Sequence, residues 1–352
     1  MKKYLFQLLI CVCFALKVNA NPDSLVIKSI YFYTGPYLFR SHTIFRADTS
    51  TNIYLYPKNF YPGTGFIDTL NNNRYGAIPI ETFTLHNGKV ISGNISEFYP
   101  SPKGLKYKEW VLESHDFDLL QSQREGWGDD FQIPTGFKNK AIYHLYNEKG
   151  NLQQGTAVGG VSSSVIYGYN NNYVIAEIAH ANIADVAYTS FEKRANGNWQ
   201  FSGVGVPDET SPMGMQCYAL NNGSLTKNGL SADKSYQLSY WQKNGAVINI
   251  SGVSILKTII GRQLDGWTFI VKQITTGGSV TLSGDGFIDE VRLHPKDAMM
   301  ITTAYRPLFG QISRCDARGN TQYWEYDGLQ RIKFEKDKDK NIIKAYDYHN
   351  KN

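Results

Sequence analysis

Short runs of apolar and aromatic residues, separated by clusters of Gly, Asn and Asp, follow one another along the chain after residue 20. In the run 236–242, Tyr236, Leu238 and Tyr240 alternate with polar residues. Alternation with a period of two places every second side chain on one face of a β-strand. No stretch after residue 20 keeps the 3.6-residue apolar period of an amphipathic helix over three turns. We therefore predict an all-β fold whose strands have one buried and one solvated face.

The spacing of the strands divides the chain into segments. Residues 21–184 contain strand-like runs of uneven spacing, including a hairpin over 81–93 whose turn is Asn87-Gly88. From about residue 185 the runs become short and evenly spaced between glycine turns, which is typical of a two-sheet sandwich. We predict a β-rich segment over 21–184, a sandwich over 185–297 and a further strand-rich segment over 298–352.

The first twenty residues have the three parts of an export signal. Lys2 and Lys3 precede the apolar run Tyr4–Leu16, and small-residue spacing at 18–20 predicts cleavage after Ala20. The apolar run is shorter than the roughly 20 residues that a membrane-spanning helix needs. We expect a secreted or cell-surface protein without a transmembrane segment.

The charge balance argues against a nucleic-acid partner. The predicted signal removes three lysines and no acidic residue from a chain with 36 basic and 31 acidic residues, so the rest is almost neutral. Binding to phosphates needs a concentrated basic face, which the sequence does not show.

Cys217 and Cys315 remain after the predicted signal is removed. In an oxidising compartment they could form one disulfide. Alternatively, both stay reduced as small buried side chains. The sequence leaves both interpretations open.

A short motif recurs near the end of the chain. Asp316–Asn320 returns as Asp337–Asn341, and Tyr326-Asp327 returns as Tyr346-Asp347. Tyr146–Leu152 is a third, separated instance of the first motif. We interpret each as two strands joined by a turn that requires Gly or Asn.

These motifs carry a family resemblance. Tyr326–Ile332 resembles the Tyr-Asp signature of YD repeats, and Asp337–Ile342 resembles the companion Asp-x-x-Gly-Asn-Ile motif. The longer stretch Thr302–Asp327 resembles Rhs-type repeat proteins of Bacteroidetes, and Tyr167–Glu177 resembles a second segment of those proteins more loosely. The resemblance implies strands that build a β shell, which in some members encloses a toxin. Because this chain is short and ends with only two recognisable units, we do not expect a closed shell or a toxin cargo.

The segment from Thr189 to Leu293 is similar to galactose-binding-like jelly rolls of the carbohydrate-binding kind. In such domains an opening Phe-Glu and a closing acidic strand flank a structural calcium ion. The resemblance implies Glu192 and Asp289 as calcium ligands, since a hard cation prefers carboxylate oxygens. The alternative is that both are surface acids at strand ends.

A glycan site needs aromatic faces that stack on sugar rings, with polar groups at the rim. Tyr240, Trp241 and Trp267 are the candidates, and Gln242 and Asn244 are their polar partners. The alternative is that these aromatic residues belong to the core.

Catalytic motifs are not evident. The sequence shows no nucleophile elbow, P-loop, dinucleotide fingerprint or zinc helix. Its seven histidines are never at the i, i+2 or i, i+4 spacing with which two imidazoles share a metal. The acid pairs Asp129-Asp130 and Asp289-Glu290 are adjacent in sequence, whereas glycosidase carboxylates face each other across a substrate.

We therefore predict a non-enzymatic structural or adhesive surface protein whose jelly roll contacts a glycan. The alternative is a truncated component of an Rhs-type toxin system. A glycoside hydrolase is the third interpretation.

Overall fold

The computed structural model describes most of the chain after residue 136 and shorter stretches before it. The described residues are 33–34, 37–38, 43–47, 50–55, 81–86, 89–99, 105–113, 133, 136–193 and 196–349. The predicted export signal and Asp129-Asp130 lie outside these residues. Within them, every regular element is a β-strand except two short 3₁₀ helices, η1 (Ile183–Asp185) and η2 (Leu220–Asn222). The predicted all-β fold is confirmed. None of the described helices is long and apolar enough to cross a membrane.

The chain divides into two compact units. The first comprises residues 1–104 and 109–138, and the second comprises 105–108 and 139–352. β7 (Lys106–Leu112) and β8 (Phe137–Tyr146) each have residues in both units.

In the first unit, the described strands pair with their neighbours in sequence. β5 pairs antiparallel with β6 from Glu81↔Ile95 to His86↔Lys89, which confirms the predicted hairpin. β3 pairs with β4, β4 with β5, and β1 with β2. The strand bounds are β1 (Tyr33–Thr34), β2 (Tyr37–Leu38), β3 (Thr43–Ala47), β4 (Ser50–Leu55), β5 (Glu81–His86) and β6 (Lys89–Phe98).

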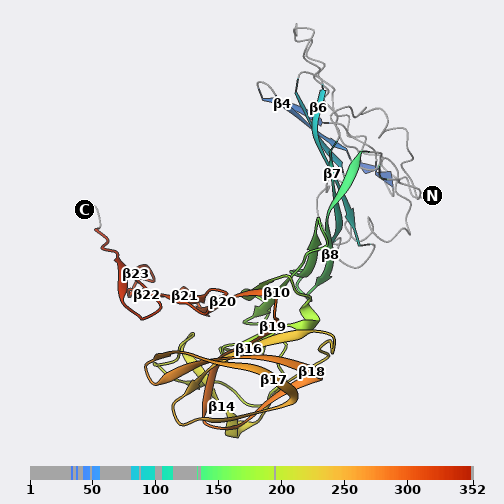
Figure 1. Cartoon of the computed structure of the whole chain (residues 1–352). Coiled ribbons are helices and arrows are strands. Elements are labelled where there is room, and N and C mark those ends of the chain that lie inside the picture. The colour runs from blue at the N-terminus through green and yellow to red at the C-terminus, as the bar shows by residue number, and fades with distance from the viewer. Residues whose placement is uncertain are drawn as a thin grey trace, which may run out of the picture. The chain divides into compact units, whose positions relative to one another are not determined.

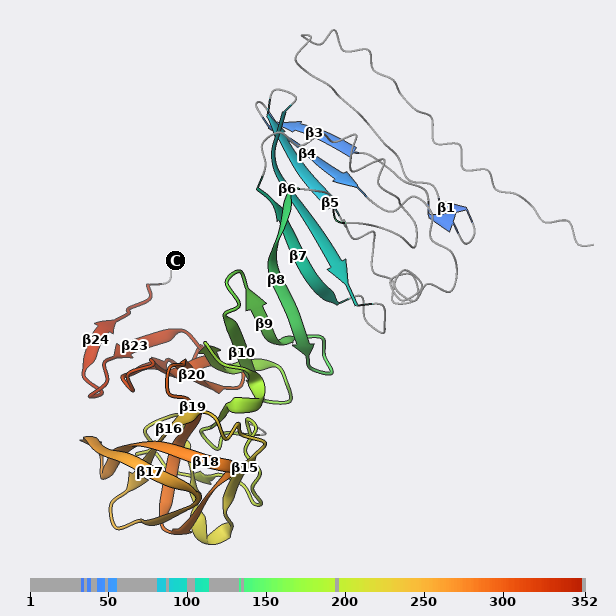
Figure 2. The same ribbon diagram turned by 45° about the vertical axis from the view of Figure 1, so that its right-hand side comes forward.

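The second unit contains a long antiparallel sheet, which we call the repeat sheet (Figure 2). Its order is β8-β9-β10-β11-β20-β21-β22-β23-β24. β11 pairs directly with β20, from Ala176↔Thr302 to Ala179↔Met299, although the residues between them form a separate sandwich. The bounds are β9 (Leu152–Ala157), β10 (Ser162–Gly168), β11 (Tyr173–Ala179), β20 (Met299–Arg306), β21 (Gly310–Cys315), β22 (Thr321–Tyr326), β23 (Ile332–Lys336) and β24 (Ile342–Ala345).

The sandwich is inserted between β11 and β20 (Figure 1). Its long central strand β16 pairs with β18 on one side and with β19 on the other. β17 pairs with β18 along almost its whole length. The bounds are β12 (Ala187–Thr189), β13 (Val206–Pro207), β14 (Gln216–Ala219), β15 (Leu225–Asn228), β16 (Ser235–Lys243), β17 (Val247–Leu264), β18 (Trp267–Asp285) and β19 (Phe287–Pro295).

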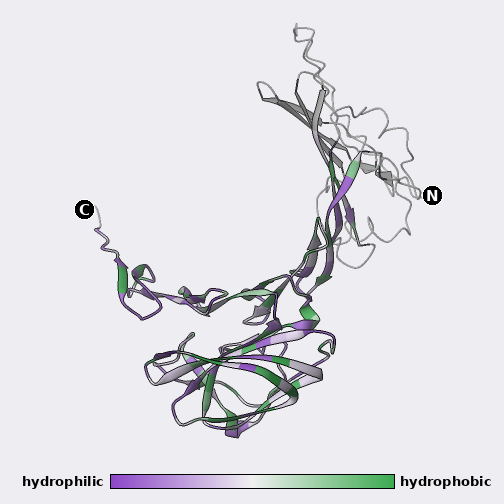
Figure 3. Cartoon of the chain, viewed as in Figure 1, coloured by the Kyte–Doolittle hydropathy of each residue, from purple (hydrophilic) through white to green (hydrophobic). Residues whose placement is uncertain are grey.

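Both faces of β16 are covered, which corrects one prediction. Tyr236, Leu238 and Tyr240 lie in the main core, as their alternation predicts. The other face was predicted to be solvated, but Ser239 and Trp241 on it are also buried. Hydrophobic and hydrophilic residues are mixed along the strands of the sandwich (Figure 3).

The recurring motif folds into one type of turn. In 316–320, Asp316 N–H donates to the Asn320 carbonyl at 2.9 Å, and the Asp316 carboxylate accepts the N–H groups of Arg318 and Asn320. The same bonds recur in the turns 147–151 and 337–341, which confirms the predicted repeat. The turn 327–331, which begins at the aspartate of the Tyr326-Asp327 motif, has the same bonds.

The fourth residue of each turn has a left-handed backbone. Gly319 has φ +87°, and the equivalent residues Gly150, Gln330 and Lys340 have φ +80°, +64° and +65°. A side chain at this conformation costs about 1–2 kcal/mol for most residues.

We expect Gly319→Ala to lower the free energy of unfolding by about 1–2 kcal/mol because of this backbone conformation. The added Cβ would also lie 3.0 Å from Phe269. Gly328→Ala is the control, because Gly328 is not in the left-handed region and a Cβ there meets nothing within 4 Å. Urea unfolding measures both, and equal stabilities of the two variants would contradict the expectation.

Candidate functional site

The three aromatic residues predicted to bind a sugar are buried. Tyr240 lies in the main core, and Trp241 and Trp267 pack with Cys217 in a second buried cluster. The indoles of Trp241 and Trp267 are 0% exposed, so neither face is open to a sugar ring. The predicted stacking platform is therefore not formed by these residues, because the faces of β16 and β18 that carry these rings are packed within the protein.

The second cluster also carries cations. The Arg262 guanidinium lies 5.0 Å from the Trp241 ring centre, and Lys243 Nζ lies 5.5 Å from that of Trp267. Trp267 Nε1 donates to Thr210 Oγ1 at 3.0 Å. The contacts of these indoles are thus made within the protein.

Glu192 and Asp289 are brought together by one loop, residues 211–216, and both are buried. Glu192 Oε1 accepts the backbone N–H groups of Met215 at 2.6 Å and Gln216 at 3.0 Å. Asp289 Oδ2 accepts Ser211 Oγ at 2.6 Å and Met213 N–H at 2.9 Å. The alternative interpretation of two surface acids is therefore wrong.

These contacts do not suit a calcium ion. A calcium ion takes six to eight oxygen ligands, whereas four backbone N–H groups and one hydroxyl donate to these two carboxylates. In the described part of the chain, no three or more His, Cys, Asp or Glu side chains are grouped to hold a metal. Calcium binding stays an untested prediction, and the shown role of both carboxylates is to hold the loop.

Burial raises the pKa of the Asp289 carboxyl well above its ordinary value, and the neighbouring Glu290 charge raises it further. Burial also raises the pKa of Glu192, although the N–H groups of Met215 and Gln216 oppose the effect. Both carboxyl groups bind the loop although burial removes them from water, which destabilises their charged forms.

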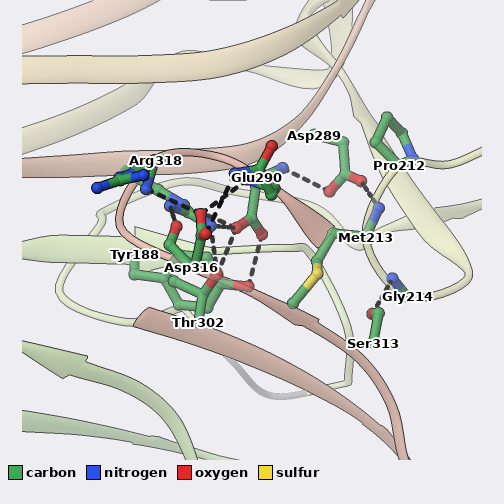
Figure 4. A network of polar contacts seen from close by, with 12 residues as sticks. Tyr188, Pro212, Met213, Gly214, Asp289, Glu290, Thr302, Ser313, Asp316 and Arg318 are labelled. Atoms are coloured by element: carbon green, nitrogen blue, oxygen red, sulfur yellow. Dashed lines mark hydrogen bonds and ion pairs between the residues drawn. The ribbon is translucent and has the colours of Figure 1, made fainter. Parts of the chain in front are cut away.

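The 211–216 loop connects the sandwich to the repeat sheet. Gly214 N–H donates to Ser313 Oγ at 3.1 Å, and Tyr323 Oη donates to the Pro212 carbonyl at 3.1 Å. Met213 packs in a buried cluster with Ala304 and Cys315. Figure 4 shows the loop between Asp289 and Ser313.

Next to this loop lies a buried ion pair. Arg292 Nε donates to Glu290 Oε1 at 2.7 Å, and Tyr188 Oη donates to Glu290 Oε2 at 2.7 Å. Arg292 also donates to Thr302 Oγ1 at 2.7 Å and to the Asp316 carbonyl at 2.9 Å. Tyr188, Glu290 and Arg292 belong to the sandwich, whereas Thr302 and Asp316 belong to the repeat sheet. We call these five residues the junction network; Figure 4 labels Tyr188, Glu290, Thr302 and Asp316.

A β-bulge directs Glu290 into the network. The register between β16 and β19 passes from Ser239↔Arg292 to Trp241↔Asp289, so two residues of β19 lie opposite Tyr240 alone. Glu290 has φ +51°, which is uncommon for a side-chain-bearing residue. Bulges turn a side chain away from its regular face.

The turn 337–341 also contacts the sandwich. Arg262 donates to the Lys338 carbonyl and lies 3.5 Å from the Asp339 carboxylate. Lys340 Nζ lies 2.7 Å from Asp265 Oδ2. The turns 316–320 and 337–341 therefore both contact the sandwich, the first through Arg292 and the second through the β17–β18 hairpin.

A further contact lies where the chain passes from β11 into the sandwich. Asp185 accepts Lys234 Nζ at 2.6 Å and Tyr236 Oη at 2.7 Å. Burial alone raises the pKa of Asp185, but these two donors, the Lys234 charge and the Ser231 N–H outweigh it and lower the pKa below its ordinary value of 3.8.

Cys217 and Cys315 are buried and form no disulfide, which agrees with the alternative that both stay reduced. Burial and the nearby Asp289 raise the pKa of Cys217 to about 12. Burial also raises the pKa of Cys315. A thiol with a raised pKa is a poor nucleophile.

The junction network is suited to holding two parts of the chain together. Each carboxylate oxygen of Glu290 accepts a hydrogen bond from a protein donor, and Tyr188, Glu290, Arg292 and Thr302 are all buried. Sequence reasoning missed Tyr188, Arg292 and Thr302 as members. Arg292 alone gave a signal, because it is a charged residue between the apolar residues Val291 and Leu293.

We expect Arg292→Met to lower the free energy of unfolding by about 3–5 kcal/mol, because it leaves the Glu290 carboxylate buried without its cation. The exposed Arg318→Met is the control and should change it by less than about 0.5 kcal/mol. Adding Glu290→Gln to Arg292→Met should restore part of the loss. Urea unfolding measures each variant, and a loss below about 1 kcal/mol for Arg292→Met would refute the role of the pair.

Asp185→Asn should destabilise the protein at pH 7 and lose its effect in acid. Because the folded pKa of Asp185 lies below the unfolded value, its stabilisation is present above about pH 4 and is lost as the pH falls through the folded pKa. The comparison is the difference in melting temperature from the parent between pH 7 and pH 2, with the exposed Asp233→Asn as control. A difference that stays constant with pH would contradict the assignment.

Comparisons with known proteins do not assign the chain to a family. No family model matches the chain. No curated protein matches it. Solved structures of TcdB2-TccC3-TEV and TcdB2-TccC3 are similar at 10% and 9% identity, each with a TM-score of 0.15. The similarity covers 90% and 85% of this chain but only 15% and 14% of those chains. At that TM-score the likeness supports no conclusion about fold or function.

Proposed function

We propose that the chain is a non-catalytic structural module of an exported surface protein, in which the inserted sandwich stabilises the repeat sheet. The observation that carries this proposal is the direct pairing of β11 with β20 on either side of the insertion. The repeat sheet is therefore continuous, and the sandwich is attached to its side.

The repeat sheet is a single layer of strands. Sheets gain stability by burying one face against another layer, and a lone layer of strands is marginal in water. β24 is exposed at every position, including Ile342 and Ile343. Towards the middle of the sheet, by contrast, Thr302, Ala304 and Cys315 are buried next to the sandwich and the 211–216 loop.

The contacts at the junction suit a structural role better than a catalytic one. Its charged side chains are buried and bonded to each other. His294, also buried, has a pKa lowered to about 4, mainly by burial, and its Nδ1 contacts the Pro295 carbonyl. Such a histidine stays neutral at pH 7 within the sandwich.

Export to the cell surface rests on the sequence of residues 1–20. Glycan contact is not part of the proposal, because the aromatic residues on which it depended are buried.

The second candidate is a component of an Rhs-type system. The observation that favours it is the common geometry of the turns beginning at Asn147, Asp316, Asp327 and Asp337, since tandem turns of one type are what a repeat array requires.

Limited proteolysis of the full chain tests the structural role. If the sandwich stabilises the repeat sheet, a fragment spanning about 139–349 should persist, and the parent should unfold in this region in one transition. Arg292→Met should open the junction and release separate fragments near residues 180 and 298. Early release of an intact 185–297 fragment from the parent would refute the proposal.

Two further assays separate the candidates. Cells that produce the full chain should expose it to externally added protease, and retention inside the cell would contradict export. Growth arrest on production of the full chain would favour the toxin-system candidate. Release of reducing sugar from polysaccharides by the purified chain would contradict a non-catalytic role.

A further inference from the structure

The outer edge of β17 is a long strand edge without a partner. β17 pairs with β18, and it pairs with no other strand among the residues that the structure describes. Residues 254–261 are exposed at every position. A strand edge of this kind presents unpaired backbone N–H and C=O groups to an incoming strand.

Apolar side chains lie on both faces of this edge. Ile260 lies opposite Ile270 and Ile255 opposite Ile274, and both β18 partners belong to the main core. Ile260 is nevertheless 72% exposed and Leu256 60% exposed. The layer that covers Ile270 and Ile274 of β18 therefore does not extend over β17. On the opposite face Ile259 lies opposite Val271 and is exposed as well.

The edge is regular where its apolar residues gather. β-bulges interrupt β17 near residues 252, 256 and 261–262, and bulges commonly protect an edge. Between them, Lys257–Ile260 pairs with Gln273–Ile270 in an uninterrupted register. An added strand would find regular backbone geometry over this stretch.

The charges at this edge have one sign. Val247–Leu264 contains no acidic residue, and its cations are Lys257 and Arg262. Arg262 is engaged with Asp339 and the Lys338 carbonyl, so it is not available. Lys272 lies opposite Thr258 on the face of Ile260 and donates to Thr258 Oγ1 at 3.2 Å, whereas Lys257 lies opposite Gln273 on the other face and is the available cation.

We propose that β17 is a docking edge for an extended segment of another protein, in which acidic residues alternate with apolar ones. The segment would add a strand at Lys257–Ile260, cover Ile255 and Ile260 with its apolar face, and pair its carboxylates with Lys257 on the opposite face. A second copy of this chain is disfavoured, because pairing β17 with itself would bring Lys257 of both copies to one seam without an acid. This inference is independent of the structural role proposed above.

The test uses the full chain and two labelled peptides. The acidic peptide is Thr-Ile-Glu-Val-Thr-Ile-Glu-Val-Thr, and its control has Lys in place of both Glu residues. By fluorescence anisotropy at low salt, the acidic peptide should bind at least about tenfold more tightly than the control peptide. Added salt should reduce the difference, because the paired charges are near the surface.

Variants of exposed residues locate the binding site. Lys257→Glu should reverse the preference between the peptides, whereas the same charge change at the exposed Lys193 should leave it unchanged. Leu256→Lys with Ile260→Lys should weaken the acidic peptide by about tenfold through loss of the apolar contact. Circular dichroism of each variant confirms that the fold is kept.

Three outcomes would overturn the proposal. In the first, neither peptide binds. In the second, both bind equally and the Lys257 variant changes nothing. In the third, sedimentation shows a dimer of the chain that Ile260→Lys dissociates, which would assign the edge to a second copy.

Discussion

The positive charge of Arg292 is the constraint on which the junction depends. A guanidinium removed from water is tolerated only when its charge is balanced and its N–H groups are bonded. Here one part of the chain supplies the balancing carboxylate, Glu290, and the other supplies two acceptors, Thr302 Oγ1 and the Asp316 carbonyl. Separating the two parts would leave buried polar groups without partners. The ion pair therefore couples the stability of the sandwich to that of the repeat sheet.

The same coupling explains why the acids of this region are structural. Asp289 and Glu192 bind backbone N–H groups of one loop, and that loop carries Met213 into the cluster with Ala304 and Cys315. A carboxylate that accepts several N–H bonds fixes a loop tightly, although its own burial is costly. The loop, the bulge at Glu290 and the ion pair thus act on one boundary, and all three would be disturbed by movement of β20 and β21.

The recurring turns show how a local rule is used for a tertiary purpose. Each turn is stabilised within itself by an Asp or Asn side chain that accepts two backbone N–H groups. The turns 316–320 and 337–341 additionally contact the sandwich, through Arg292 and Arg262 respectively. The turn at Asp327 has the same internal bonds, and its Arg331 pairs with its own aspartate at 2.8 Å. One turn geometry therefore serves both to reverse the chain and to dock it.

The sequence alone determined the all-β class, the hairpin over 81–93, the core face of Tyr236, Leu238 and Tyr240, and the recurring turns. These features follow from interactions between residues near each other in the chain, namely alternation, turn chemistry and backbone conformation. Only the tertiary structure decided that β11 pairs with β20, that Trp241 and Trp267 are buried, and that Glu192 and Asp289 hold a loop. Each depends on which distant strand covers a given face, and alternation identifies an apolar position without identifying its partner. Ser239 illustrates the limit, since a polar residue on the predicted solvated face is buried where a second layer packs against it.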